Sequence, residues 1–439
     1  MKRTLFFAAL FVCSGAFAQD VPGIDSPMFR GNLQHTGVYD AAGVPKFNSV
    51  KWKFKTAGRV VSSPAVVGDT AFVGSLDHNL YAVDRATGAQ KWKFATESKV
   101  SSSPAVAGGV VYFGSMDGNF YAVDAASGKL KWKFKTGGER RYTATHLHGA
   151  LPALEAMPDP FDFYSSSPAV SGGNVYFGSG DGNVYALDAA TGDLKWSFKT
   201  GDVVHSSPAF ANGVVYIGGW DTFFYAIDAA TGKEKWRLKT GDDPAIHNQI
   251  GIQSSPAVVD GMVYFGCRDS NLYAVDAATG EKKWVFNNKG SWVIGSPAVS
   301  KGRVYFATSD SGMFYGLDAK TGAEIFNLKF TWPMFASPAI AGNTLYLGSN
   351  EGKLTAIDLT TQKPTWVFQT DDSKLNGPAL TNPADGKTNY QAAFRDFYYD
   401  DVVVGVDKLL TVGAFLSSPA VVDKTIYIGS TDGYLYALE

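Results

Sequence analysis

A Ser-Ser-Pro-Ala-Val pentapeptide, intact or degenerate, recurs along the chain, and its spacing constrains the fold more than any other feature. Successive copies lie 40, 64, 40, 48, 41, 41 and 81 residues apart. A period near 40 residues with occasional insertions is typical of a radial or solenoid array. The prolines of the eight copies are Pro64, Pro104, Pro168, Pro208, Pro256, Pro297, Pro338 and Pro419.

Each repeat contains four short runs of β-forming residues separated by turn residues. In the second repeat, the Ser-Pro-Ala-Val run is followed by Val111–Ser115, Tyr121–Asp124 and Lys131–Phe134. Four strands in about 40 residues is the content of one propeller blade. The sequence therefore predicts an all-β fold, an eight-bladed β-propeller of four-stranded antiparallel blades that forms a single domain over residues 50–439.

The last repeat lacks one strand, and the N-terminal part of the chain holds a spare one. The chain stops at Tyr434–Leu438, before the outermost tryptophan-containing strand, whereas Val50–Phe54 precedes the first repeat and has that strand's pattern. We expect the N-terminal strand to complete the last blade, because this pairing removes an exposed edge and ties the termini together.

One large aromatic residue occupies the same place in every repeat, after Ala-x-Asp-x-x-Thr-Gly or a near copy of it. An indole at such a place suits docking between neighbouring blades, where its N–H can reach a backbone carbonyl. The Asp-x-x-Thr-Gly residues are interpreted as turn formers. The predicted docking residues are Trp52, Trp92, Trp132, Trp196, Trp236, Trp284, Phe326 and Trp366.

These Ala-x-Asp-x-x-Thr-Gly-x-x-x-Trp units resemble the tryptophan-docking motifs of the pyrroloquinoline quinone (PQQ) repeat family. That family includes quinoprotein alcohol dehydrogenases and the propeller subunit of the outer-membrane β-barrel assembly machine. Met28–Gly37, in the leading segment 19–49, also resembles the N-terminal segment of the family. The resemblance implies the propeller fold, but both enzymes and scaffolds are built on this fold.

The first 18 residues have the pattern of a secretory signal peptide. Lys2 and Arg3 form its basic region, Leu5–Val12 its apolar core, and Ala16–Ala18 a small-x-small cleavage site. The apolar run is too short to span a bilayer, and no other stretch is long enough. We therefore expect an exported periplasmic protein without a membrane span, acting as a monomer. The net charge of −2 and the lack of a basic stripe exclude nucleic acid as a partner.

Three insertions interrupt the repeats, at residues 137–164, 241–253 and 371–415. All three connect one blade to the next, so alternation of strand direction places them on one face of the propeller. Long loops on a rigid scaffold commonly carry function. The third insertion contains an aromatic run, Phe394 to Tyr399, for which a helix is one interpretation.

Candidate ligand-binding residues cluster on that face around the fourth and fifth blades. The residue before each Ser-Ser-Pro is expected at the mouth of the central channel, and aromatic and polar residues of nearby turns and connections surround it. Polar donors beside aromatic plates suit a planar or sugar-like anionic ligand, although polar loops are also the ordinary state of this face. The candidates are His205, Trp220, His247, Asn248, Gln249, Gln253, Arg268, Trp292 and Trp332.

Arg268 departs from the corresponding turn residue of every other repeat. Its guanidinium could hold a ligand carboxylate in bidentate fashion, or it could pair locally with Asp269 or a neighbouring loop acid. As surface positions, Arg268 and Gln253 are expected to tolerate substitution by Ala with a stability change within about 0.5 kcal/mol.

Most catalytic and metal-binding motifs are missing from the sequence. His146-x-His148 could hold a metal only if Glu155 or Asp159 folded back, and a solvated loop is the preferred interpretation, so no metal site is predicted. No haem, nucleophile-elbow or phosphate-loop motif occurs. The adjacent cysteines usual in quinoprotein alcohol dehydrogenases are lacking, and their calcium ligands cannot be placed, so no catalytic residue is assigned.

These observations favour a periplasmic scaffold that presents its insertion-rich face to a periplasmic or outer-membrane protein or to a small planar or anionic ligand. The resemblance implies a role in cell-envelope or outer-membrane protein assembly. Two alternatives stay open. The chain could be a PQQ-dependent oxidoreductase, with PQQ and calcium held near His205, Gln253 and Arg268, or a sugar- or peptidoglycan-binding module.

Overall fold

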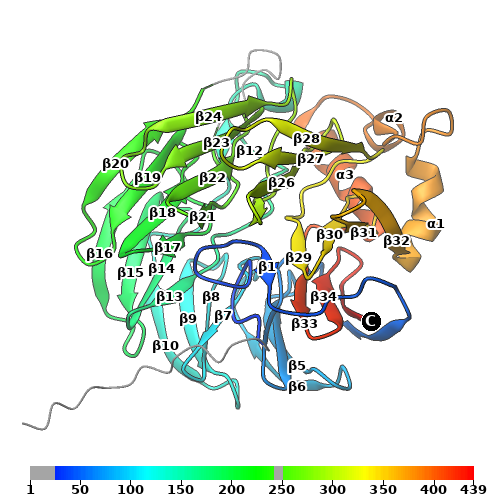
Figure 1. Cartoon of the computed structure of the whole chain (residues 1–439). Helices are drawn as coiled ribbons and strands as arrows, with labels where there is room; N and C mark the ends of the chain where they lie inside the picture. Colours follow the sequence, from blue (N-terminus) through cyan, green and yellow to red (C-terminus); the bar gives the residue numbers. More distant parts are fainter. Residues whose placement is uncertain (1–24, 242–250) are drawn as a thin grey trace, which may run out of the picture.

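The computed structural model describes residues 25–241 and 251–439. They form eight blades of four antiparallel strands around a central axis (Figure 1), and one blade carries an additional short parallel strand on its inner edge. The predicted eight-bladed β-propeller is therefore confirmed. The predicted signal peptide, residues 1–18, lies outside the described residues.

In each of blades 1 to 4, the strands follow one another from the channel outwards. Blade 1 contains β3 (Ala65–Val67), β4 (Thr70–Gly74), β5 (Asn79–Asp84) and β6 (Gln90–Ala95). Blade 2 contains β7 (Ala105–Ala107), β8 (Val110–Gly114), β9 (Asn119–Asp124) and β10 (Leu130–Lys135). Blade 3 contains β13 (Ala169–Ser171), β14 (Asn174–Gly178), β15 (Asn183–Asp188) and β16 (Leu194–Lys199). Blade 4 contains β17 (Ala209–Ala211), β18 (Val214–Gly218), β19 (Phe223–Asp228) and β20 (Glu234–Lys239).

Blades 5 to 7 repeat this order, and blade 8 combines the two ends of the chain. Blade 5 contains β21 (Ala257–Val259), β22 (Met262–Gly266), β23 (Asn271–Asp276) and β24 (Lys282–Asn287). Blade 6 contains β25 (Ala298–Ser300), β26 (Arg303–Ala307), β27 (Met313–Asp318) and β28 (Glu324–Lys329). Blade 7 contains β29 (Ala339–Ala341), β30 (Thr344–Gly348), β31 (Lys353–Asp358) and β32 (Lys363–Gln369). Blade 8 contains β33 (Ala420–Val422), β34 (Thr425–Gly429), β35 (Tyr434–Leu438) and β2 (Val50–Lys55).

The predicted closure of the ring by the N-terminal strand is confirmed. β2 pairs antiparallel with β35, with Trp52 opposite Ala437 and Lys53 opposite Tyr436. Because β35 would otherwise present an unpaired edge, this pairing completes the blade and joins the two ends of the chain.

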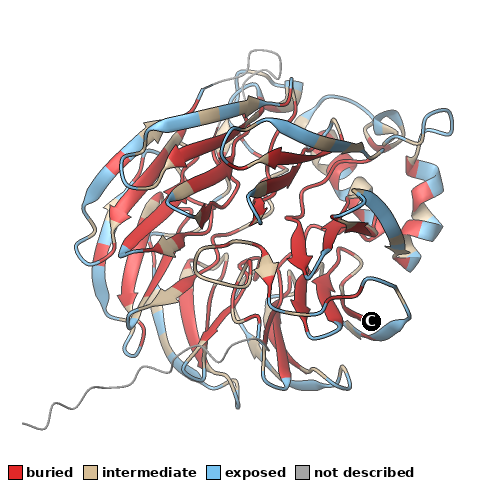
Figure 2. Cartoon of the chain, in the orientation of Figure 1, coloured by how far each residue is buried: buried red, intermediate tan, exposed pale blue. Residues whose placement is uncertain are grey.

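Burial follows the position of a strand within its blade. The second and third strands are almost wholly buried, because both of their faces pack against neighbouring blades (Figure 2). The outermost strands are more exposed, and β10 half-buries only alternate residues, Trp132 and Phe134. These Val-, Tyr- and Phe-rich runs therefore form strands that are covered on both sides, whereas the Lys-rich outer runs face solvent.

Six of the seven outer-strand tryptophans donate a hydrogen bond to the turn of the next blade, and Trp366 donates instead to Val44 of the leading segment. The indole Nε1 of Trp132 donates a hydrogen bond to the carbonyl oxygen of Ala189 at 3.1 Å, and Trp52 bonds likewise to Arg85 at 3.0 Å. The indole of Trp132 also lies against Gly192, which has a φ of 80° and where an added Cβ would come within 2.6 Å of the ring. The glycine of the Thr-Gly pair thus serves both the turn and the inter-blade contact.

A closed circle of serines lines the channel. In each blade, Oγ of the serine before the inner-strand proline accepts a hydrogen bond from the backbone N–H of the same serine in the preceding blade, at 2.8–3.1 Å. The bond from Ser418 to Ser63 completes the circle. This contact links all the inner strands and explains why Ser-Pro recurs at the same position in every repeat. The eight serines are Ser63, Ser103, Ser167, Ser207, Ser255, Ser296, Ser337 and Ser418.

The leading segment, blue in Figure 1, crosses the middle of the ring. Its carbonyl oxygens accept hydrogen bonds from the inner strands of blades 1, 2, 4, 5, 6 and 7 in ring order, and β1 (Val38–Tyr39) pairs parallel with β29. The buried Arg30 donates to the carbonyl oxygens of Pro338 and Pro297 at 2.5 and 3.0 Å. The accepting residues are Ser26, Pro27, Leu33, Gln34, Thr36 and Gly37.

The first and third insertions have structure of their own. The first contains β11 (Thr143–Ala144), the 3₁₀ helix η1 (Leu147–Gly149) and β12 (Met157–Pro158), with β11 and β12 paired antiparallel. The third contains α1 (Asp371–Leu380), α2 (Tyr390–Ala393), α3 (Tyr399–Leu409) and η2 (Leu410–Val412). None of the helices in the described parts of the chain is long and apolar enough to cross a membrane.

The helical interpretation of the aromatic run from Phe394 to Tyr399 is wrong for most of its length. Residues 394–398 link α2 to α3 without being helical, and only Tyr399 lies in a helix. The run pairs instead with the first insertion: Leu151 donates its backbone N–H to Phe397, and Tyr399 donates to Leu151. This inter-insertion pairing satisfies backbone groups that a continuous helix would have satisfied internally.

Candidate functional site

The first and third insertions together form a cap over the channel mouth. Apolar residues of α1, α2 and α3 pack with Phe161 and Phe163 of the first insertion and with side chains at the mouth. The hydroxyl of Tyr164 donates to the carbonyl oxygen of Leu416 at 3.0 Å, and that of Tyr399 donates to Pro158 at 2.6 Å. The cap is therefore anchored to the ring and held together across the two insertions.

Below the cap, the channel is a narrow cavity. The eight side chains that precede Ser-Ser-Pro line it, including His205 and Gln253, together with the circle of serines and Phe29 of the leading segment. Its volume is about 40 Å³, enough for a few water molecules only. The channel thus has no room for a substrate or cofactor.

Arg268 lies at the centre of the contacts between ring and cap. Its side chain is fully buried, and its Nη1 lies 2.5 Å from Oδ2 of Asp159. Its Nε and Nη2 donate to Oε1 of Gln253 at 3.2 and 2.7 Å. Arg268 was expected either to bind a ligand carboxylate or to pair with a nearby acid. The structure contains the second arrangement, and the acid is Asp159 of the first insertion.

The expectation that Arg268 and Gln253 occupy tolerant surface positions is wrong. The exposed fractions of these residues are 0% and 4%. Sequence comparison among the repeats identified the turn that holds Arg268, but it could not show that an insertion from two blades away covers that turn.

Two indole rings enclose the guanidinium of Arg268. Its central carbon lies 4.3 Å from the ring centroid of Trp220 and 4.3 Å from that of Trp292. Tyr142 stacks on Trp220 with centroids 4.3 Å apart and planes at 15°. A cation between two aromatic faces gains attraction from both, especially where water is excluded.

Asp159 is held as a carboxylate. Burial alone would raise the pKa of Asp159, but Arg268 and His148 hold it well below its usual range. His148 Nε2 lies 3.0 Å from Oδ1, and the backbone N–H of Phe161 donates to the same oxygen at 2.8 Å. His148 therefore serves the ion-pair network, and no group of three metal-ligating side chains occurs among residues 25–241 and 251–439.

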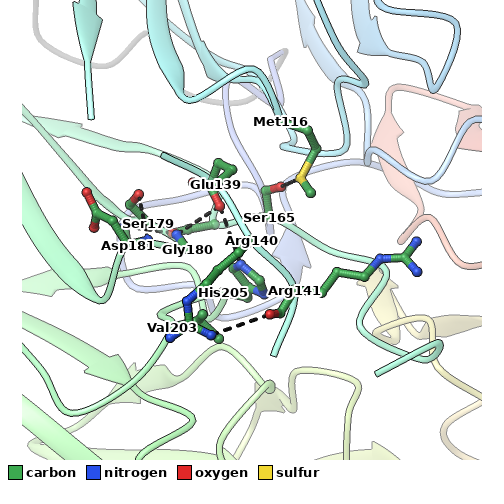
Figure 3. Close-up of polar contacts among 12 residues, drawn as sticks. Met116, Glu139, Arg140, Arg141, Ser165, Ser179, Gly180, Asp181, Val203 and His205 are labelled. Atoms are coloured by element: carbon green, nitrogen blue, oxygen red, sulfur yellow. Dashed lines mark hydrogen bonds and ion pairs between the residues drawn. The ribbon is translucent and has the colours of Figure 1, made fainter. Parts of the chain in front are cut away.

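His205 forms a second buried ion pair with the first insertion. Its Nδ1 lies 2.8 Å from Asp162, and its Nε2 lies 3.5 Å from Glu139. Burial alone would lower the pKa of His205, but Asp162 and then Glu139 raise it to about 10. Glu139 also accepts a hydrogen bond from the backbone N–H of Gly180 at 2.8 Å (Figure 3). His205 thus holds the first insertion to blade 4, and Gly180 holds it to blade 3.

The remaining candidates are distributed unevenly. Trp332 is buried in the apolar contact between cap and mouth, while His247, Asn248 and Gln249 lie outside the described residues. The buried indole N–H groups of Trp220, Trp292 and Trp332 have no hydrogen-bond partner in the structure. Sequence reasoning missed Glu139, Asp162 and Tyr142, although an insertion rich in acids opposite an unusual histidine and arginine was a usable signal.

The residues around Arg268 do not fit PQQ. A planar cofactor would need a free aromatic face and a free guanidinium, but Tyr142 and Arg268 cover the two faces of Trp220. The guanidinium of Arg268, which would bind a cofactor carboxylate, is already paired with Asp159. We derive no reaction step through PQQ.

The outer surface of the cap carries an exposed apolar patch where the two insertions meet. Leu151 and Tyr398 form an isolated parallel bridge there. The exposed fractions are 41% for Leu151, 80% for Leu154, 66% for Phe397 and 56% for Tyr398. These four residues are called the seam patch. Large exposed apolar side chains gathered on a rigid support are typical of interaction sites.

One protein-family model matches most of the chain. The family is described as outer membrane protein assembly factor BamB, and the matched residues are 45–156, 159–287 and 268–407. No curated protein matches the chain significantly.

Solved structures share the fold at low sequence identity. BamB from Moraxella catarrhalis is 17% identical, with a TM-score of 0.62 over 89% of this chain and 97% of that chain. A europium-containing methanol dehydrogenase is 15% identical, with a TM-score of 0.68 over 94% and 98%. The computationally designed Ika8 protein is 16% identical, with a TM-score of 0.65 over 89% and 99%. An assembly factor, an enzyme and a design thus share one architecture, which alone assigns no activity.

Proposed function

The chain belongs to the family described as outer membrane protein assembly factor BamB, and from this membership we propose that it is a scaffold of the cell envelope that binds a protein partner through its cap. The observation that carries the proposal is the seam patch, an exposed apolar surface held in place by backbone pairing between two insertions.

The surroundings of the seam patch define the chemistry of the partner. Asp396, Asp400 and Asp401 flank Phe397 and Tyr398 in sequence, and the first two are exposed; Arg395, also exposed, leaves this rim with a net negative charge. A partner surface with apolar side chains bordered by Lys or Arg would match both the apolar centre and the acidic rim. We expect the centre to supply affinity and the rim to supply orientation and dependence on salt.

Rigid support favours binding at this surface. The cap is anchored to the ring by Tyr164 and by the buried ion pairs of Arg268 and His205. A preorganised surface loses little conformational freedom when a partner binds. The buried network around Arg268 is therefore assigned to positioning of the cap rather than to ligand contact.

The proposal is tested by photocrosslinking followed by an affinity measurement. A photoreactive residue at Phe397 should crosslink one envelope protein, whereas the same residue at Val285, an exposed apolar position on β24, should not. With the purified partner, a Phe397→Ser/Tyr398→Ser variant should bind at least about tenfold more weakly, and Val285→Ser should bind normally. Equal crosslinking at both positions, or an unchanged affinity, would reject the proposal.

Export and the competing sugar-binding role are tested separately. We propose a monomer released to the periplasm after cleavage near Ala18, which fractionation, N-terminal sequencing and sedimentation would check. Saturable binding of peptidoglycan fragments that survives the seam-patch substitutions would favour the sugar-binding module instead.

A further inference from the structure

A second cavity opens on the opposite sector of the cap from Arg268, above blades 1 and 2. Its volume is about 220 Å³, smaller than sites for drug-sized ligands and well above that of the channel. Both insertions contribute to it, together with the mouth of the channel. The lining residues used below are Arg59, Lys99, Met116, Arg141, Phe163 and Val406.

Three cations face this cavity. Arg59 pairs with Asp407, with Nη1 2.6 Å from Oδ1. Lys99 and Arg141 have no carboxylate partner within ion-pair distance among residues 25–241 and 251–439. Asp162 also lines the cavity, but it is engaged by His205. The cavity therefore holds more positive than negative charge.

The repeats provide an internal control for this charge. Arg59 and Lys99 occupy the same repeat position, five residues before the repeat proline. The other six blades have no charged residue there; they have Phe163, Val203, Gly251, Trp292, Pro333 and Ala414. Two cations in adjacent blades are thus a local departure from the repeat and not a property of the fold.

Arg141 adds a cation from the first insertion. Figure 3 shows its side chain extending away from Glu139 and His205, whereas that of Arg140 turns the other way. Arg140 is paired with Asp202 at 2.7 Å. Two consecutive arginines thus have different environments, and Arg141 is the one that reaches the cavity.

The rest of the lining is largely apolar. Met116 of blade 2, Phe163 of the first insertion and Val406 of α3 contribute side chains, and Val406 is buried. Apolar walls with a few convergent polar groups are the usual composition of a small-molecule site. An apolar group would replace water against these walls, while an anionic end would meet Lys99 and Arg141.

We propose that this cavity binds a small apolar carboxylate. The volume limits the ligand to about the size of one amino-acid side chain with its carboxylate, and the Arg141 guanidinium suits the two oxygens of that group. The same chemistry is offered by a free aliphatic acid and by the C-terminal residue of a polypeptide. The site is separate from the seam patch, so it does not depend on the proposed partner binding.

The test uses the full mature chain and calorimetric titration with four probes. Hexanoate represents the free acid and N-acetyl-L-leucine the C-terminal residue; hexanamide and N-acetyl-L-leucinamide are their uncharged counterparts. At least one acid should bind saturably below about 10 mM with a stoichiometry near one, and its amide should bind at least about tenfold more weakly. The acid that binds more tightly identifies the source.

Matched variants assign the binding to this cavity. Lys99→Gln and Arg141→Gln should each weaken acid binding about tenfold, whereas Arg140→Gln and Phe397→Ser should leave it unchanged. Circular dichroism and melting temperature check that each variant is folded, and Lys99→Met or Arg141→Met replaces the corresponding glutamine variant if that variant is not. Lack of saturation by both acids, equal binding of acids and amides, or equal effects of Arg140→Gln and Arg141→Gln would overturn the proposal.

Discussion

Arg268 and Asp159 form a fully buried ion pair across 109 residues of sequence, with Nη1 and Oδ2 2.5 Å apart. One residue belongs to a turn of the repeated ring and the other to an insertion that only one blade connection has. The pair therefore couples the stability of the cap to that of the propeller. Because each charge is removed from water, neither is tolerated without the other.

Removal of this pair should destabilise the protein strongly. Arg268→Ala leaves the Asp159 carboxylate buried without its main partner, so we expect the free energy of unfolding to fall by about 3–5 kcal/mol. Arg237→Ala is the control, since Arg237 lies at the surface and its ion pair with Glu234 should contribute no more than about 1 kcal/mol. Chemical denaturation measures both variants. A loss below about 1 kcal/mol for Arg268→Ala would contradict the assigned role.

The His205 pair should make stability depend on pH. The pKa of His205 is raised to about 10 in the folded protein, above the unfolded value of about 6.5. Its protonation therefore stabilises the fold fully below about pH 6.5, and this contribution is lost as the pH rises towards 10. The stability difference between wild type and His205→Gln, measured by denaturation from about pH 6 to 10, should shrink with rising pH. A constant difference would show that the ring is not protonated in the fold.

Closure of the ring depends on the N-terminal strand. Trp52 packs between blade 8 and blade 1, with its Nε1 bonded to Arg85. We expect Trp52→Ala to lower the free energy of unfolding by about 3–5 kcal/mol. Lys53→Ala, which removes an exposed ion pair with Asp371 from the same strand, should change it by less than about 1 kcal/mol. Similar melting temperatures for the two variants would argue against a role of Trp52 in closure.

PQQ should not bind with stoichiometric occupancy. The faces that a planar quinone would need are covered by Tyr142 and Arg268, so binding would have to disrupt a buried ion pair. Absorbance titration with PQQ and calcium should give no saturable signal up to tens of micromolar. Saturable uptake that is lost in Trp220→Ala would show that the aromatic site opens for the cofactor.

The fold was predictable because its information is local and repeated. Each blade has the same four runs and the same turn residues, and the surplus strand Val50–Phe54 matched the deficit at Tyr434–Leu438. Because the pattern occurs eight times, an irregular residue in one repeat does not obscure the strand order of the others. The pairing of β2 with β35 could then be predicted from one further condition, that a closed ring leaves no strand edge unpaired.

The candidate site was only partly predictable, because its decisive contacts are non-local and occur once. Arg268 stood out against the other repeats, yet its meaning depends on Asp159, which lies in an insertion without a repeated counterpart. The partner of His205, Asp162, belongs to the same insertion. A repeat pattern identifies the exception, but only the path of the insertion shows whether that exception meets solvent, a ligand or another part of the chain.

The pairing of β2 with β35 also has a consequence for the order in which the protein is made. β2 precedes every other blade strand along the chain, and its partner β35, Tyr434–Leu438, follows all of them. During synthesis, the growing chain must therefore keep both its early strand and each newly added blade from pairing with the wrong neighbour. Such long sequence separation slows folding and prolongs the exposure of strand edges. Until β35 pairs with β2, the ring stays open and both strands keep an unpaired edge.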